Sequence, residues 1–215
     1  MIGEMGMGTT VVAITLATLV GFLVMASVME LLAAKRRNTE ALYLVTRVGA
    51  RHGYPLQEKP LSLIIPEGKG SAVMHYYLLA PGEERDSIAL KAERPATSRL
   101  GNLVIDNDPS RVFTAGLKRL VLATPQFDPY FRIFTEAERS EFVRTLLASS
   151  AEFLFLVKDL ACRSRTGHFE MVDLSGKVKI QFDDRGIRFP SDVERITLDV
   201  VRLYRLYRLL AGAGE

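Results

Sequence analysis

The residues that could carry nucleophilic or metal chemistry are few in this chain. There is one cysteine, Cys162, and there are three histidines, His52, His75 and His168. Cys162 and His168 have no second pair beside them, whereas a zinc site takes about four ligands in paired spacings. The favoured interpretation of Cys162 is a small apolar residue near a helix end. The sequence therefore predicts no catalytic residue, no metal site and no cofactor.

An acidic stretch imitates the start of a calcium loop. Asp106, Asp108 and Ser110 alternate as the first ligands of such a loop do, but Arg111 and Leu117 stand where its glycine and its last glutamate are needed. A turn stabilised by an Asp side chain is the better interpretation. No nucleophile, base and orienting group come together in the sequence. We therefore expect a non-catalytic protein, with a membrane-bound enzyme of unrecognised site as the alternative.

The dominant element is an uncharged run near the N-terminus. It extends from Met5 to Met29, between Glu4 and Glu30. A helix needs roughly 20 apolar residues to cross the hydrocarbon of a bilayer. A signal peptide would begin with a basic residue and have a shorter apolar core, and a core helix of a soluble protein rarely stays uncharged for so long. The run predicts a transmembrane helix over residues 9–34.

A basic cluster, Lys35, Arg36 and Arg37, follows this run directly. Short basic flanks stay on the cytoplasmic side of a membrane. The sequence therefore predicts a single-pass protein of the plasma (inner) membrane with its N-terminus outside and its C-terminal domain in the cytoplasm. The predicted parts are an extracytoplasmic tail (1–8), the transmembrane helix (9–34), a juxtamembrane helical stalk (35–55) and a cytoplasmic α+β domain (56–215).

Small residues line one stripe of the predicted span. Thr9, Ala13, Ala17 and Gly21 follow one another at a spacing of four, which places them on one helix face. Small side chains let two helices approach closely in lipid. We expect membrane lipid around this helix and a protein partner, or a second copy in a homo-oligomer, on this face. The alternative is that such residues are simply common in membrane helices.

The remainder of the chain predicts an α+β domain with mostly antiparallel strands between about 60 and 125. Helical stretches are expected near 136–162, as one helix or two, and near 190–211, with a strand meander between them. Thr135 and Glu138 have the spacing of a helix capping box. Alternating apolar residues and flanking turns predict strands at 61–65, 72–80, 87–93, 100–105, 117–122, 130–134, 169–174, 177–182 and 187–189.

The C-terminal helix carries a basic flank of Arg202, Arg205 and Arg208. These side chains could contact anionic lipid headgroups, which would make the protein a peripheral lipid-binding module. The alternative, which we favour, is a solvated flank on a helix whose apolar stripe packs on the domain's own sheet. Only Glu4 and Glu30 of the 25 acidic residues, and none of the 28 Lys and Arg, lie in the first 34 residues, which leaves a net charge of +5 for the rest. This charge is too small and too dispersed to indicate a nucleic-acid partner.

Overall fold

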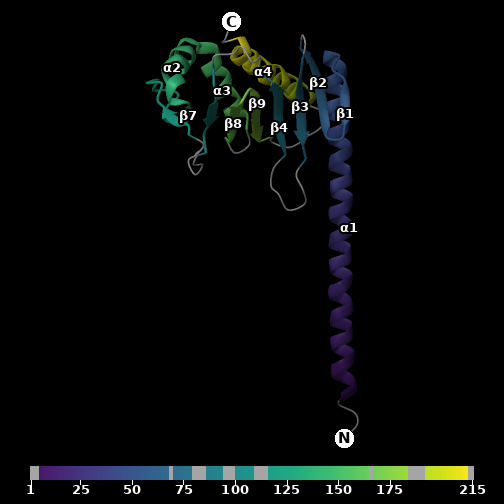
Figure 1. Ribbon diagram of the computed structural model, residues 1–215. Helices are drawn as coiled ribbons and strands as arrows, with labels where there is room; N and C mark the ends of the chain where they lie inside the picture. Colours follow the sequence, from purple (N-terminus) through teal and green to yellow (C-terminus); the bar gives the residue numbers. More distant parts are fainter. Residues whose placement is uncertain are drawn as a thin grey trace. The chain divides into compact units, whose positions relative to one another are not determined.

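The computed structural model describes residues 5–67, 70–78, 86–93, 100–108, 116–164, 167–183 and 192–212 (Figure 1), without the side chains of 5–11, 13, 67, 70 and 71. The chain separates into two compact units, Met1–Glu40 and Ala41–Glu215. The first holds the helical segment that the sequence predicts to cross a membrane. The second holds the last part of that helix, the sheet and the remaining helices.

Helix α1 is continuous from Met5 to His52. No Pro or Gly lies between Gly21 and Gly49, so nothing in this stretch interrupts the backbone hydrogen bonds. The helix ends before Gly53, whose φ of 68° is a left-handed conformation that glycine adopts without strain. Helix α1 thus includes the predicted span and most of the predicted stalk, and it also includes the last four residues of the predicted tail 1–8.

The last turns of α1 belong to the folded domain. Their fully buried side chains are Ala41, Leu44, Val45 and Val48, which lie in the same core as the strands. Gly49 lets the helix approach β2 closely, because a Cβ atom there would lie 2.7 Å from Cδ2 of Leu63. The compact domain therefore begins at Ala41, whereas the sequence analysis assigns residues 35–55 to a stalk outside it.

The described strands form one nine-stranded sheet in the order β1-β2-β3-β4-β9-β8-β5-β7-β6, and every neighbouring pair is antiparallel. This confirms the predicted α+β class. The β8–β9 hairpin, predicted as part of the meander between the helical stretches, lies in the middle of the sheet. The last predicted strand of that meander, 187–189, lies outside the described residues, and the short edge strand β1 was not predicted. The strands are β1 (Leu56–Glu58), β2 (Leu61–Glu67), β3 (Gly70–Tyr77), β4 (Ser87–Glu93), β5 (Leu103–Asp106), β6 (Lys118–Leu120), β7 (Arg132–Thr135), β8 (Phe169–Leu174) and β9 (Lys177–Asp183).

The two faces of the sheet differ in character. On one face, buried apolar residues stand opposite one another on neighbouring strands, as in Met74↔Leu90, Leu90↔Ile180 and Met171↔Ile180. Because side chains alternate across a strand, the residues between these point to the second face. That face carries Lys91, which is exposed.

Helices pack on the apolar face. A 3-10 helix (Ala137–Arg139), α2 (Ser140–Ser149) and α3 (Ala151–Arg163) follow β7, and α4 (Asp192–Gly212) follows β9. Helix α4 packs against β4 and β9, and α3 packs against β8 (Figure 1). The predicted apolar stripe of α4 is buried in the core at Ile196, Val200, Leu203, Tyr207 and Leu210.

The helical stretch predicted near 136–162 consists of two helices that meet at Ser150. Its backbone has φ −98° and ψ 84°, and its hydroxyl accepts a hydrogen bond from the N–H of Phe153, which caps α3. The predicted capping box at Thr135 and Glu138 is wrong. Thr135 ends β7, and its hydroxyl donates to the carbonyl of Asn102 instead (3.1 Å).

Candidate functional site

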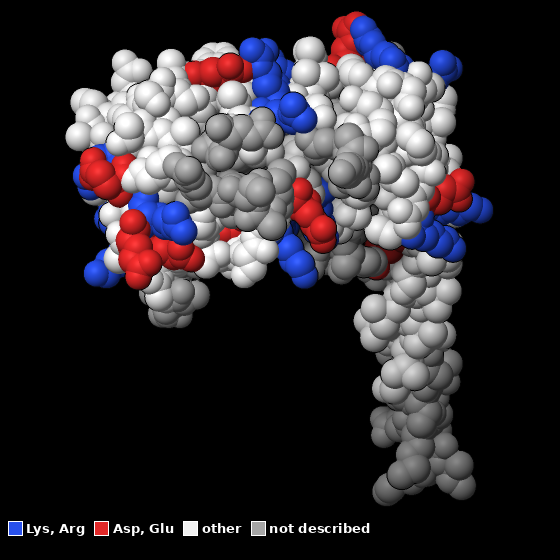
Figure 2. All heavy atoms as spheres, turned by 45° about the horizontal axis from the view of Figure 1, so that its top comes forward, with Lys and Arg blue, Asp and Glu red and all other residues white. Residues whose placement is uncertain are grey.

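The first candidate site is the apolar segment of α1. The helix is long and apolar enough from Ile14 onward to cross a membrane, and none of that apolar window is buried. The described residues of the segment appear as uncharged white atoms in Figure 2. The hydroxyls of Thr18 and Ser27 donate to the carbonyls of Ile14 and Leu23 (2.8 and 2.9 Å). These two hydroxyls thus find acceptors within the helix, as polar side chains in a lipid environment require.

The predicted packing face lies entirely within this helix. Thr9, Ala13, Ala17 and Gly21 all belong to α1, although the side chains of Thr9 and Ala13 lie outside the described part of the chain. Ala17 and Gly21 are exposed. A Cβ atom at Gly21 would meet nothing within 4 Å. This face is therefore free of contacts at Gly21, and its association with another helix stays a prediction.

The basic flank follows the apolar segment on the same helix. Arg36 donates to Oε1 of Glu40 at 2.8 Å, and its side chain is otherwise exposed. That hydrogen bond raises the pKa of Arg36 above its already high ordinary value. From Met5 to Glu30 the helix rises about 37 Å at 1.5 Å per residue, which exceeds the roughly 30 Å of bilayer hydrocarbon. Lys35, Arg36 and Arg37 thus stand beyond a membrane-length segment.

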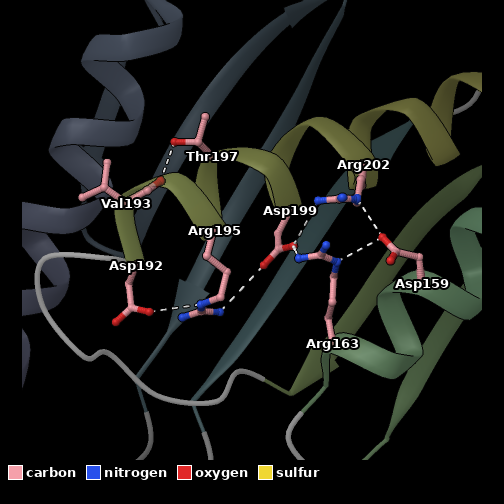
Figure 3. A network of polar contacts seen from close by, with 8 residues as sticks. All are labelled: Asp159, Arg163, Asp192, Val193, Arg195, Thr197, Asp199 and Arg202. Atoms are coloured by element: carbon pink, nitrogen blue, oxygen red, sulfur yellow. Dashed lines mark hydrogen bonds and ion pairs between the residues drawn. The ribbon is translucent and has the colours of Figure 1, made fainter.

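The second candidate site is a group of charged side chains between α3 and α4 (Figure 3). At its centre, the fully buried carboxylate of Asp199 accepts a hydrogen bond from Arg163 (3.3 Å). Ion pairs of 3.7 and 3.9 Å join it to Arg195 and Arg202. Asp159 of α3 lies 3.0 Å from Arg163 and 2.7 Å from Arg202, so each helix contributes both signs of charge.

This charge network joins the two helices and does not present a reactive group. A buried carboxylate must be paired, and here guanidinium groups surround it, so it is not available as a base or a metal ligand. The network was not predicted from the sequence, although a signal was present. The residues Asp192, Arg195, Asp199 and Arg202 alternate in charge at spacings of three and four, and Asp159 and Arg163 do the same on α3. Such spacing places the charges of each helix on one stripe.

The three arginines predicted to contact lipid lie in different surroundings. Arg202 belongs to the charge network, with 24% of its side chain exposed. Arg205 forms an ion pair with Glu152 of α3, but 65% of its side chain remains exposed. Arg208 is exposed on the next turn of α4. The structure thus brings Arg202 into the α3–α4 contact and leaves the other two at the surface, where their contact with lipid stays a prediction.

The Cys and His residues lie in different parts of the fold. Cys162 is exposed near the end of α3, and His168 is half-buried just before β8. His52 stacks on Tyr54, with ring centroids 5.0 Å apart. Among the described residues, no group of three or more His, Cys, Asp or Glu could hold a metal ion.

The acidic stretch after β5 forms the turn that its composition predicts. The N–H of Asp108 donates to Oδ1 of Asp106 at 2.7 Å, the hydrogen bond of an Asx turn. Asn107 joins this turn to the β8 strand, because its Oδ1 accepts from the N–H of Phe169 at 2.9 Å. The oxygens at Asp106 and Asn107 thus organise the backbone here. Ser110 and Arg111 lie outside the described residues.

No protein-family model and no curated protein matches the sequence. Among solved structures, the chain is similar to the crystal structure of the mycobacterial trehalose monomycolate transport factor A, with a TM-score of 0.40 and 12% sequence identity. The similarity covers 78% of this chain and 96% of that chain.

Proposed function

We propose that this protein is a single-pass protein of the plasma (inner) membrane, with its N-terminus outside and its α+β domain in the cytoplasm. Its role is that of a non-catalytic interaction, assembly or accessory module. One observation carries the proposal. Helix α1 joins a membrane-length, uncharged and exposed segment to the basic cluster Lys35–Arg37, and that cluster favours the cytoplasmic side.

The arrangement of charged groups supports a non-catalytic role. The fully buried carboxylate of Asp199 is compensated by arginines, and these charges join two helices. A protein that presents surfaces and holds them at a membrane fits these properties better than an enzyme does.

The topology can be tested with a reporter that is active only in the cytoplasm, fused after Glu215. We expect an active fusion and a protein that carbonate does not extract from membranes. An inactive but well-expressed fusion would reverse the proposed orientation. Extraction by carbonate would show that α1 does not span the membrane.

A second candidate function, binding of anionic lipid by α4, is favoured by the exposed ridge of that helix. Leu198 and Val201 are 50% and 43% exposed, and Arg205 and Arg208 continue the same ridge. Apolar side chains next to arginines suit a lipid interface. A fluorophore on Val201→Cys, in a Cys162→Ser background, tests this in nanodiscs. A blue shift in anionic but not in neutral lipid would support the lipid contact, and equal spectra would contradict it.

A further inference from the structure

The second face of the sheet carries a row of side chains with an unusual centre. Following the strand register across the sheet, the residues of this row are Ile64, Val73, Lys91, Lys179, Val172, Val104, Phe134 and, at the edge, Arg119. Two lysines on β4 and β9 thus stand directly opposite each other, with aliphatic residues on both sides. Like charges directly opposite in an antiparallel pair destabilise a sheet. This lysine pair therefore lowers the stability of the sheet slightly.

The charge at the centre of the row is only partly compensated within the described domain. Nζ of Lys179 lies 3.6 Å from Glu170, and 39% of the Lys179 side chain is exposed. Lys91 is exposed, and its Nζ lies over the ring of Tyr77, 5.3 Å from the centroid. Burial and the charge of Lys91 lower the pKa of His75, on the strand next to Lys91, below its ordinary value. Lys91 thus has an aromatic ring, and no described carboxylate, beside its ammonium group.

The neighbours of the lysines in the row are apolar and partly accessible. Val73 and Val172, one strand away on each side, are half-buried, as are Ile64 and Phe134 further out, whereas Val104 is fully buried. Neighbouring strands lie about 4.8 Å apart, so Val73 and Val172 are separated by roughly 14 Å. That distance corresponds to about ten residues of helix. The face thus offers a positive centre between two apolar flanks to a segment of that length.

We propose that this row is a docking surface for an acidic amphipathic segment of a partner protein. A carboxylate of the segment pairs with Lys91, and its apolar side chains cover Val73 and Val172. Charge complementarity identifies this occupant, because a second copy related by a two-fold axis at the row would set lysines against lysines. The inference rests on the proposed role as an interaction module, and it names the class of partner.

The test uses the full chain in its own membrane, with the photo-crosslinker benzoylphenylalanine in place of Val73. We expect a crosslink to a segment of another protein in which acidic residues lie between apolar ones. Lys91→Glu should reduce the crosslink about tenfold, because it replaces the attracting charge with a repelling one. This variant also sets opposite charges on β4 and β9, so it should fold at least as well as the parent. Lys59→Glu, at an exposed turn outside the row, is the matched control and should change nothing.

The crosslinked segment is then synthesised as a peptide and titrated onto the full-length protein in neutral nanodiscs. Replacing its acidic residues by Gln or Asn, or changing Lys91→Gln in the protein, should each weaken binding about tenfold. A crosslink to a second copy or only to lipid, no crosslink, or one that Lys91→Glu leaves unchanged would overturn the inference. Carbonate extraction and the C-terminal reporter, measured in the same cells, score membrane topology separately. A correctly inserted protein without the crosslink would contradict the docking surface alone.

Discussion

The membrane-length segment of α1 and the C-terminal helix α4 are both long and rich in apolar residues. The two helices differ in how these residues are arranged around the helix axis. In α1, large apolar side chains point in all directions and remain exposed, with Phe22 at 74% and Leu31 at 72%. In α4, the apolar side chains form one stripe that the sheet buries. The polar stripe of α4 beside it is compensated by charges from α3.

The difference shows that the arrangement of apolar residues, more than their number, selects the environment of a helix. A helix that is apolar on one stripe can bury that stripe against a single sheet face. A helix that is apolar all round needs apolar surroundings on every side, which a domain of this size cannot supply to a segment outside its core. Lipid supplies them. Each prediction below changes one helix and leaves the other as a reference.

The largest effect is expected from charges placed in the apolar segment of α1. Changing Leu19→Arg and Val20→Arg should cost roughly 5–7 kcal/mol of insertion free energy, at 2.5–3.5 kcal/mol for each central Arg. Most of the protein should then be extracted by carbonate. The matched control is Thr46→Arg with Ala50→Arg, two exposed positions on the domain part of the same helix. If the first pair inserts as well as the control, this segment of α1 does not lie in lipid.

The next largest effect is expected at the buried carboxylate of α4. Asp199→Ala removes the centre of the charge network and leaves Arg163 and Arg195 without it. Breaking a buried ion pair from one side costs about 3–5 kcal/mol of unfolding free energy. Denaturant unfolding of the detergent-solubilised chain, followed by circular dichroism, measures this cost.

The control for Asp199 is an exposed acidic residue of the same helix. Glu194 lies 3.8 Å from Arg51, and both side chains are largely exposed. Glu194→Ala should therefore change the unfolding free energy by about 0.5 kcal/mol or less. Similar losses for the two variants would mean that the network around Asp199 is no more important than a surface ion pair.

A third prediction compares two glycines of α1. A Cβ atom at Gly49 would meet Leu63 at 2.7 Å and the Tyr54 carbonyl at 3.0 Å, whereas one at Gly21 would meet nothing. Gly49→Ala should lower the unfolding free energy by about 1–3 kcal/mol through overpacking. Gly21→Ala should leave domain stability unchanged. Equal stability of the two variants in denaturant unfolding would show that α1 does not pack closely on β2.

The elements that could be predicted from the sequence are those defined by local pattern. The strands at Ser87–Glu93 and Phe169–Leu174 have the predicted bounds, because alternation and flanking turns specify them locally. The place of the β8–β9 hairpin between β4 and β5 could not be predicted, since strand order depends on pairing between residues far apart in the chain. The predicted helix cap at Thr135 is wrong for the same reason. Its hydroxyl meets Asn102, which no helix-start pattern reveals.

The candidate sites show the same division. The membrane-length segment and its basic flank are visible in the sequence, because one stretch contains everything they require. The network around Asp199 could be predicted only in part. Its charges recur at helical spacing, but its burial depends on the packing of α3 against α4. The two lysines of the sheet face, Lys91 and Lys179, can be recognised as neighbours only when the register of β4 and β9 is known.

The smallest effect is expected on the small-residue face of α1. Ala17→Leu with Gly21→Leu adds bulk where two backbones would meet, without lowering hydrophobicity, so insertion should be unchanged. Association with a second copy or a partner helix should weaken by about 1 kcal/mol, because close packing drives association in lipid. A crosslinking assay in membranes measures this, with Leu19→Ile and Leu23→Ile on another face as the control. If the small-face variant associates as well as the parent, α1 serves only as an anchor. Partners would then be bound by the α+β domain, for which the proposed docking surface around Lys91 is the candidate.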